Sequence, residues 1–383
     1  MQNQPDHRPP EPAGHEPGLA GPGIPPSPLL TAPGAVPADG PDAGVAAHYG
    51  DPFAEQRALS GALGVVDRSH RGVIRITGQD RLSWLHSLTT AALEKLASGS
   101  SAEALVLSPN GHVQFHLTLT DDGSAIWAHV EPGTAEPLVE FLESMRFMLR
   151  VEPADVTAEY AVVTLLGADA AAITPGEAGG ADAVAVTRAF GTDLIVPRHR
   201  LSEVAAELQT RSGGVLAGMW AHEALRIAAR RPRFGVDTDH RTIPHEVGWI
   251  ETAVHLSKGC YRGQETVARV HNLGHPPRRL VFLHLDGSED RLPAHGDPVT
   301  VPGAKDAADP AAPVTVGFVG SAARHYELGP IALALVKRSV PVGAPLAAAG
   351  IAAAQEVIVP PDAGANVTVS LRRTRGDLSR SRE

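Results

Sequence analysis

The only cysteine of this chain, Cys260, lies in a segment whose residue types could do chemistry. Around the thiol stand an ammonium, two glycines, a phenol, a guanidinium, a carboxamide and a carboxylate: Lys258, Gly259, Tyr261, Arg262, Gly263, Gln264 and Glu265. One thiol cannot close an intrachain disulfide, so its chemistry would be thiol exchange with a partner, ligation of a shared metal or nucleophilic attack. The neighbouring ammonium of Lys258 favours the reactive thiolate. The alternative is a small buried side chain in a turn.

This segment, continued by Thr266-Val267-Ala268-Arg269, resembles the signature of the YgfZ-type folate-binding proteins. They are a non-catalytic branch of the superfamily of the glycine cleavage T-protein, an aminomethyltransferase. The likeness extends over about residues 50–360, with further similar segments at 76–85, 225–227, 243–249, 317–321 and 331–336. The resemblance implies that Cys260 is the functional centre, with Lys258 beside it and the motif reaching Arg269.

The hydrophobic pattern predicts an α+β architecture followed by a small β-barrel. A strand at 73–77 precedes a helix that Asp80 would cap, and two hairpin signals, Asn110-Gly111 and Asp121–Gly123, precede a helix at 135–148. A second set of strands and helices follows, with strands near 161–166 and 193–196 and helices near 200–210 and 218–229. The resemblance implies a GcvT-like folate-binding platform of antiparallel sheets with packed helices, and then a C-terminal β-barrel.

We expect four segments along the chain. Residues 1–46 are rich in Pro, Gly and Ala and should be a disordered tail, because they offer little apolar surface to bury. Residues 47–276 form the α+β region, with sub-domains at about 47–155 and 156–276. Residues 277–365 form the barrel, with a loop insertion at 303–313, and residues 366–383 form a polar tail.

Composition and charge restrict location and partners. The chain is 43% hydrophobic and 20% charged, which is typical of soluble globular proteins. It has no apolar run near the ~20 residues that span a bilayer, and its start lacks the features of a secretory signal. With an unpaired cysteine, this predicts a cytoplasmic protein without a membrane partner. The net charge of −10 argues against direct binding to duplex nucleic acid.

The resemblance implies a central cavity for tetrahydrofolate or a related reduced folate. The candidate contacts are Arg226, Glu246, Trp249, Gln114 and His116. Trp249 could stack on a pterin or pack in the core. The superfamily's pterin-reading Glu is replaced here by Ala228, and the lost charge-assisted hydrogen bond is worth ~1.5–3 kcal/mol. We therefore expect weaker folate binding than in members that retain this Glu, unless Glu246 or Asp237 compensates.

Arginines and one lysine gather near these candidate contacts. The run comprises Arg226, Arg230, Arg231, Arg233, Arg241, Lys258, Arg262 and Arg269. It could hold an anionic ligand tail, for which the resemblance names the polyglutamate of a folate. The alternative is a solvated face with internal ion pairs. Both interpretations stand at this point.

The T-protein's catalytic acidic pair is absent from the aligned position, where this chain has Gln114, Phe115 and His116. Phe115 cannot transfer a proton, and His116 is the only titratable substitute. On an alternating strand, His116 and Gln114 share a face. We interpret His116 as a polar cavity residue and expect no transferase activity. The histidines at 271, 275, 284 and 295 lack the spacing of metal ligands, so no metal site is predicted.

The resemblance implies a folate-binding protein that supports assembly or repair of iron–sulfur clusters, with a link to tRNA modification. Its partners would be a reduced folate and iron–sulfur proteins or cluster-assembly factors. Two alternatives stay open. One is a one-carbon transferase with altered residues, and the other is a scaffold that has lost its ligand and acts through partners alone.

Overall fold

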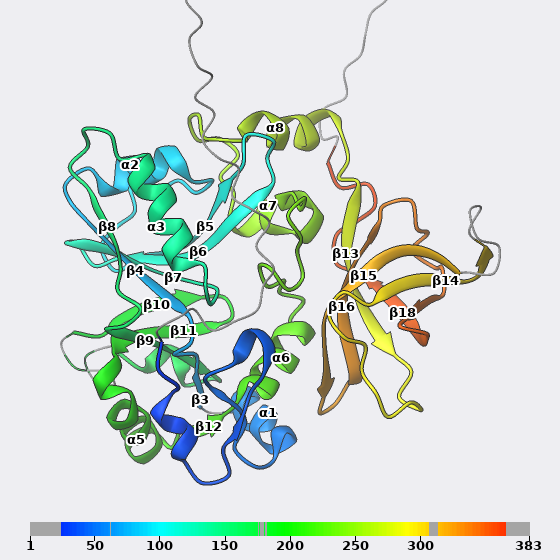
Figure 1. The fold of residues 1–383 in the computed structure, drawn as a ribbon, viewed down its shortest axis with the longest axis horizontal. Helices are drawn as coiled ribbons and strands as arrows, with labels where there is room; N and C mark the ends of the chain where they lie inside the picture. Colours follow the sequence, from blue (N-terminus) through cyan, green and yellow to red (C-terminus); the bar gives the residue numbers. More distant parts are fainter. Residues whose placement is uncertain are drawn as a thin grey trace, which may run out of the picture.

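The computed structural model describes residues 24–364 except 62, 175, 177–179, 181 and 306–312. These residues form two five-stranded sheets with packed helices and a closed six-stranded barrel (Figure 1). The barrel stands beside the two sheets, and helices α6, α7 and α8 lie between them (Figure 1). The predicted class, α+β followed by a β-barrel, is confirmed.

The first sheet has the strand order β5-β6-β7-β4-β8, and all its neighbours are antiparallel. Its strands are β4 (Gly72–Thr77), β5 (Ser101–Leu107), β6 (Val113–Asp121), β7 (Ala125–Val130) and β8 (Glu152–Asp155). Helices α2 (Arg81–Leu88) and α3 (Ala135–Ser144) cover one face through Leu85, Leu138 and Leu142. The helix predicted to reach residue 148 ends earlier, since Phe147 has a positive φ of 49° that no α-helix accommodates.

The second sheet has the order β10-β11-β9-β3-β12. Its strands are β3 (Gly64–Asp67), β9 (Tyr160–Leu166), β10 (Val184–Arg188), β11 (Gly191–Pro197) and β12 (Val215–Ala217), which pairs parallel with β3. Helix α5 (Leu201–Ser212) buries Leu201, Val204 and Leu208 against it. Trp127 of the first sheet packs against Val162 and Ile195 of the second, so the two sheets share one apolar junction.

The barrel follows a helical connection made of η5 (Pro244–Val247), α7 (Trp249–Thr252) and α8 (Gln264–Leu273). Its strands are β13 (Arg278–Leu285), β14 (Pro298–Lys305), β15 (Pro313–His325), β16 (Gly329–Lys337), β17 (Leu346–Ala348) and β18 (Ile351–Val357). Helix α6 (Met219–Ala228) places Ala224 and Ile227 against barrel residues such as Phe282 and Leu333. Within the described ranges, every helix is too short or too polar to cross a bilayer.

The prediction of disorder up to residue 46 is wrong for residues 24–46. They form η1 (Pro28–Thr31), β1 (Val36–Pro37) and η2 (Gly40–Asp42) and lead into β2 (Ala46–His48), which pairs with β1. Val45, Ala46 and Ala47 are buried, because the core beside α1 (Pro52–Ser60) and α6 offers matching apolar surface. The composition of this segment led us to underestimate how much apolar surface its small side chains can bury. Residues 1–23, the centre of the predicted insertion and the tail at 366–383 lie outside the described residues.

A substitution at Gly218, just before α6, can test how tightly residues 24–48 are docked. A Cβ there would lie 2.2 Å from the Ala47 carbonyl oxygen, and the Gly218 N–H donates to Glu55. Gly218→Ala should therefore lower the free energy of unfolding by about 1–3 kcal/mol. Gly343→Ala is the matched control, since no atom lies within 4 Å of its Cβ position. Urea denaturation of both variants measures the difference, and equal stabilities would contradict tight docking.

Candidate functional site

A cavity of about 850 Å³ lies where the two sheets, α6, α7 and the segment after β18 meet. Both sheets, α6 and the following turn contribute charged side chains to its wall. The Val247–Ser257 connection contributes mostly apolar and aromatic ones, and Ile358 to Pro360 close the barrel side. A volume of this size is typical of small-molecule sites in proteins.

Trp249 and His116 form one wall of the cavity. Their ring centroids are 4.6 Å apart, and His116 lies on β6 opposite Leu105, with Phe115 facing the core on the other side of the strand. His116 Nε2 lies 3.5 Å from a carboxylate oxygen of Glu103. Burial alone would raise the pKa of Glu103, but contact with His116 and the charges of Arg231 and Arg188 lower it to about 2. Glu103 is therefore an ionised acceptor at neutral pH.

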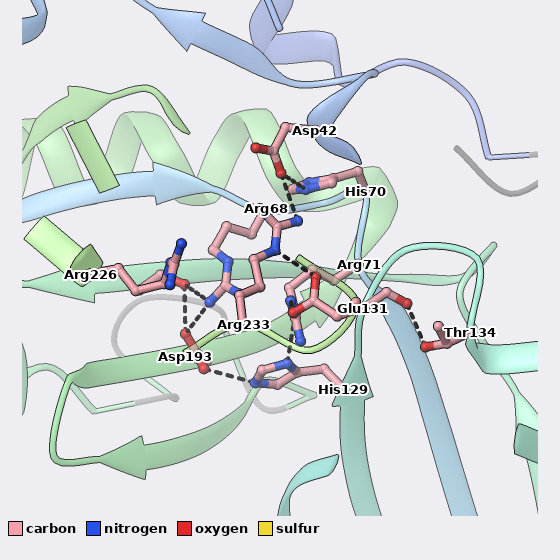
Figure 2. A network of polar contacts seen from close by, with 12 residues as sticks. Asp42, Arg68, His70, Arg71, His129, Glu131, Thr134, Asp193, Arg226 and Arg233 are labelled. Atoms are coloured by element: carbon pink, nitrogen blue, oxygen red, sulfur yellow. Dashed lines mark hydrogen bonds and ion pairs between the residues drawn. The ribbon is translucent and has the colours of Figure 1, made fainter. Parts of the chain in front are cut away.

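The floor of the cavity is a buried network of ion pairs (Figure 2). Arg233 donates to Glu131 at 2.8 Å and contacts Asp42 at 2.8 Å, and Arg71 contacts Glu131 at 2.6 Å. His70 also contacts Asp42, at 3.0 Å. Burial by itself raises the pKa of Glu131, but Arg233 and Arg71 hold it well below its usual range.

Asp193 of β11 is the second centre of this floor. It contacts Arg188 at 2.7 Å and His129 Nε2 at 2.8 Å, and Thr164 donates to it at 2.6 Å. The pKa of Asp193 lies well below its usual value, since Arg188 and His129 outweigh the effect of burial. Two elements far apart in sequence, β7 and β10–β11, are therefore joined by charge as well as by the apolar junction.

The arginines that follow α6 are engaged in ion pairs. Arg226 contacts Glu223 at 2.7 Å and Asp237 at 2.8 Å, Arg231 contacts Glu103 at 2.6 Å, and Arg230 contacts Glu356. Of the two interpretations of the basic run, internal pairing describes residues 226–233. A ligand tail would have to compete with carboxylates already in place.

The predicted ligand contacts fall into two groups. Arg226, Trp249 and His116 line the cavity. Glu246 is fully buried elsewhere, where it accepts from Arg278 at 2.8 Å, and neither it nor Gln114 belongs to the cavity wall formed by described residues. Sequence reasoning missed Arg68, Arg188, Glu103 and His222, which also line the cavity. Their only sequence signal was charged side chains near the ends of predicted strands or inside an apolar helix.

The motif segment places Cys260 in the open and Lys258 in the interior. The thiol of Cys260 is exposed, whereas Lys258 is 8% exposed. The Lys258 ammonium donates to the carbonyls of His86, Thr89 and Ala91, at 2.5 Å for Thr89 and 3.1 Å for Ala91. Its three N–H groups thus satisfy one carbonyl of the last turn of α2 and two carbonyls that follow the helix. Burial lowers the pKa of Lys258 to about 8. Lys258 anchors the loop by its ammonium, a role the sequence did not predict.

Gly263 fixes the other end of the loop. Its φ is +80°, and a Cβ there would lie 2.6 Å from the Ser108 carbonyl and 3.0 Å from Gly111. The turn of the β5–β6 hairpin therefore packs directly on the start of α8. Tyr261 is buried beneath the Lys258 ammonium, and Arg262 stacks over Phe141.

The remaining motif residues flank these anchors. Gly259 has open space around its Cβ position and no positive φ. Gln264, Glu265 and Arg269 lie on α8, where the carboxylate of Glu265 suits the first turn of a helix. The cavity wall reaches Ser257, three positions before the exposed thiol.

The sequence comparisons relate part of the platform to a known domain family. Residues 50–178 match the GCVT N-terminal domain family. An Arabidopsis thaliana protein named "Putative transferase At1g60990, chloroplastic" is 28% identical over 65% of this chain, and the match spans 61% of that protein, less than two thirds of its length. The aminomethyltransferase of Symbiobacterium thermophilum is 27% identical over 67% of this chain and 76% of its own. The chain is thus a distant homologue of aminomethyltransferases.

The fold is shared as well. The crystal structure of the glycine cleavage system aminomethyltransferase T from Bartonella henselae superposes with a TM-score of 0.70, covering 87% of this chain and 96% of that one. The sequence identity is 18%. The described platform and barrel therefore have a GcvT-like fold.

Replacing Lys258 tests its anchoring role. Lys258→Met keeps the apolar stem but leaves three buried carbonyls without their donor, so unfolding should become easier by at least about 2 kcal/mol. Lys337→Met is the control, because exposed Lys337 donates to one carbonyl, that of Thr315, and should change stability by less than about 0.5 kcal/mol. Comparable losses in the two variants, measured by urea titration, would argue against the anchor.

His129 should make stability depend on pH. Its Nδ1 accepts from Arg71 Nε at 2.9 Å and its Nε2 lies 2.8 Å from Asp193, which fixes a neutral ring. Burial lowers the pKa of His129 from 6.5 to about 3. Below pH 6.5 the unfolded chain binds a proton that the folded ring refuses, so this contribution to stability is present at neutral pH and falls as pH falls.

The measurement is the slope of unfolding free energy against pH between about pH 6.5 and about pH 5. In His129→Gln, which cannot titrate there, the slope should be shallower by about 0.7 kcal/mol per pH unit at pH 6.5, where the unfolded imidazole is half protonated, and by about 1.4 kcal/mol per pH unit near pH 5, the value for one proton. His222 and His245, also held neutral by burial, titrate equally in both proteins. Equal slopes in the wild type and in His129→Gln would show that the folded His129 ring takes up the proton.

Proposed function

We propose that this protein binds a reduced folate of the tetrahydrofolate type in the central cavity and supports iron–sulfur cluster assembly or repair through Cys260. One observation carries the proposal: a ligand-sized cavity with an aromatic wall ends three residues before the chain's single, exposed thiol. A ligand in that cavity would contact the Val254–Ser257 segment, which leads directly to the motif. Binding could thereby change the position of the loop that presents the thiol.

Several features support the folate part. The relatives include named aminomethyltransferases, and the fold is that of an aminomethyltransferase T. The Trp249 ring forms part of the wall beside His116. It is 3% exposed and also belongs to the apolar core, so a flat heterocycle would stack on the part of the ring that faces the cavity. Ala228, at the position of the superfamily's pterin-reading Glu, is partly buried against the core that includes Trp249. A pterin here would thus be read by other groups of the cavity.

The cavity chemistry favours binding over one-carbon transfer. Phe115 and His116 stand where the aminomethyltransferase has acidic residues, and Glu103, which contacts His116, is held ionised by its cationic neighbours. A carboxylate with a pKa of about 2 is a poor proton donor near neutral pH. We therefore propose a binding protein whose function is exerted by the thiol on a partner, such as an iron–sulfur protein or a cluster-assembly factor.

The folate part is tested by calorimetric titration with tetrahydrofolate, preceded by mass spectrometry of small molecules released from natively purified protein. We expect saturable binding that Trp249→Leu weakens by about tenfold to a hundredfold, because a stacking contact on a flat ring contributes ~1–3 kcal/mol. Trp220→Leu is the matched control, since Trp220 is 55% exposed and stacks on His48 outside the cavity wall.

Binding unaffected by Trp249→Leu would place the folate elsewhere. No binding to any variant would leave the scaffold that acts through partners alone.

The thiol part is tested with Cys260→Ser. The substitution should change the free energy of unfolding by less than about 0.5 kcal/mol, because the side chain is exposed. In cells lacking the protein, the serine variant should fail to restore the activity of iron–sulfur enzymes that the wild type restores.

Iodoacetamide supplies an independent readout, since each chain holds one cysteine. The native protein should be alkylated as fast as the urea-unfolded chain within about a factor of ten, and Cys260→Ala should not react. Full rescue of iron–sulfur enzymes by the serine variant would refute the role of the thiol and leave folate binding standing.

A further inference from the structure

Three side chains at one corner of the cavity carry buried nitrogen atoms that have no hydrogen-bond partner in the described part of the chain. These atoms are Arg68 Nε, Arg188 Nε and His222 Nε2, and all three side chains line the cavity. Arg188 Nη2 also lacks a hydrogen bond, but it lies 2.7 Å from Asp193. Arg68 and His222 are 7% and 2% exposed. Buried polar atoms are almost always hydrogen-bonded, since leaving one unpaired costs about 1–3 kcal/mol. These atoms therefore point to a bound polar group.

The three side chains form one corner. Arg188 ends β10, and Phe190 in the following turn meets the His222 ring edge-on, with centroids 5.7 Å apart. Burial and the charge of Arg68 lower the pKa of His222 to about 4, although the contact with Glu223 acts in the opposite direction. Arg68 and Arg188 share Asp193, at 3.5 Å and 2.7 Å. Two guanidiniums and one imidazole thus lie close together in the cavity wall.

The hydrogen-bonding character of each nitrogen follows from its neighbours. A guanidinium Nε always carries a proton, so Arg68 and Arg188 offer donors. His222 Nδ1 lies 3.3 Å from Glu223, whose pKa is far below its usual value, so that carboxylate can only accept and Nδ1 must carry the ring proton. The ring is neutral at pH 7, and Nε2 is left as an acceptor. The corner therefore presents donors and an acceptor side by side.

The lone pair of His222 Nε2, rather than the charge balance, disfavours an anion at this corner. Arg68 and Arg188 share one carboxylate, Asp193, and Glu223 behind His222 is already paired with arginines of its own. A bound carboxylate would face the lone pair of Nε2 unless the ring took up a proton. A neutral group that has an oxygen acceptor next to an N–H donor meets all three atoms without that penalty.

We propose that Arg68, Arg188 and His222 recognise the edge of a neutral amide or lactam. Its carbonyl oxygen accepts from the arginine Nε–H groups, and its N–H donates to His222 Nε2. A reduced pterin carries such an edge, so the inference rests on the proposed function for the identity of the ligand. It names residues other than the position of Ala228 as the readers of that ligand.

The test uses two probes in calorimetric titrations. Hypoxanthine offers a lactam without a carboxylate, and p-aminobenzoyl-glutamate offers carboxylates without a lactam. We expect hypoxanthine to bind with no net proton uptake in buffers of different ionisation enthalpy. His222→Phe, which keeps the ring against Phe190, should weaken it at least about tenfold, as should Arg188→Met. Arg291→Met, at an exposed ion pair on the barrel, is the control.

The outcomes separate this inference from folate binding. The proposal for the corner is overturned if hypoxanthine does not bind, or if it binds all variants with equal affinity. It is also overturned if p-aminobenzoyl-glutamate binds in a way that depends on Arg188 and takes up one proton. Tetrahydrofolate binding that neither corner variant affects leaves the proposed function standing without the corner. Hypoxanthine binding through the corner without tetrahydrofolate binding leaves the corner standing without the folate. If one variant fails to fold, the other decides.

Discussion

The arrangement of the platform depends on Arg233. Its buried guanidinium contacts Asp42 from the N-terminal segment, Glu131 after β7, and Glu223 on α6. These carboxylates come from three distant parts of the chain, and Arg233 is the cation that all three share, although each also has a second partner of its own. Removing one partner of a buried pair typically costs 3–5 kcal/mol, although forming the pair adds little net stability. The network thus specifies one arrangement of the N-terminal segment, the first sheet and α6.

The cavity exists because the apolar cores stop short of this network. One core joins β5 and β6 to α6 and the barrel, and another joins the two sheets through Trp127. Between them the floor of the cavity is polar. Most of the arginines there are matched by carboxylates, which explains how so many cations occupy one interior without repelling each other. The few nitrogen atoms without a hydrogen-bond partner are therefore better indicators of a ligand-binding position than the many paired ones.

The motif segment around Cys260 is also held in place by specific contacts with other parts of the fold. Lys258 completes the end of α2, Tyr261 fills the core, and Gly263 lets the β5–β6 turn reach the start of α8. These residues hold the loop by both ends and leave Cys260 exposed between them. The anchoring contacts account for Lys258, Tyr261, Arg262 and Gly263 by structure alone. Cys260 is exposed and contributes no anchoring contact of this kind.

Local pattern determined much of this protein. The strand at 72–77, the hairpins at Asn110-Gly111 and Asp121–Gly123, the helices α3, α5 and α6 and the barrel all follow from alternation, helical spacing and turn residues, which act over a few positions. The alternation along β6 also placed His116 on the cavity side and Phe115 in the core. The family-like motif marked Cys260.

Only the tertiary structure decided which charges meet. Glu246 was a candidate ligand contact by its place in the chain, yet Arg278, 32 positions away, holds it outside the cavity wall. The order of residues 24–46 likewise depends on partners on α1 and α6, and Arg68, Arg188 and His222 come together from three separate elements. Burial makes such long-range pairings decisive, because a charge or an apolar group removed from water is stable only beside the specific partner that the fold brings to it.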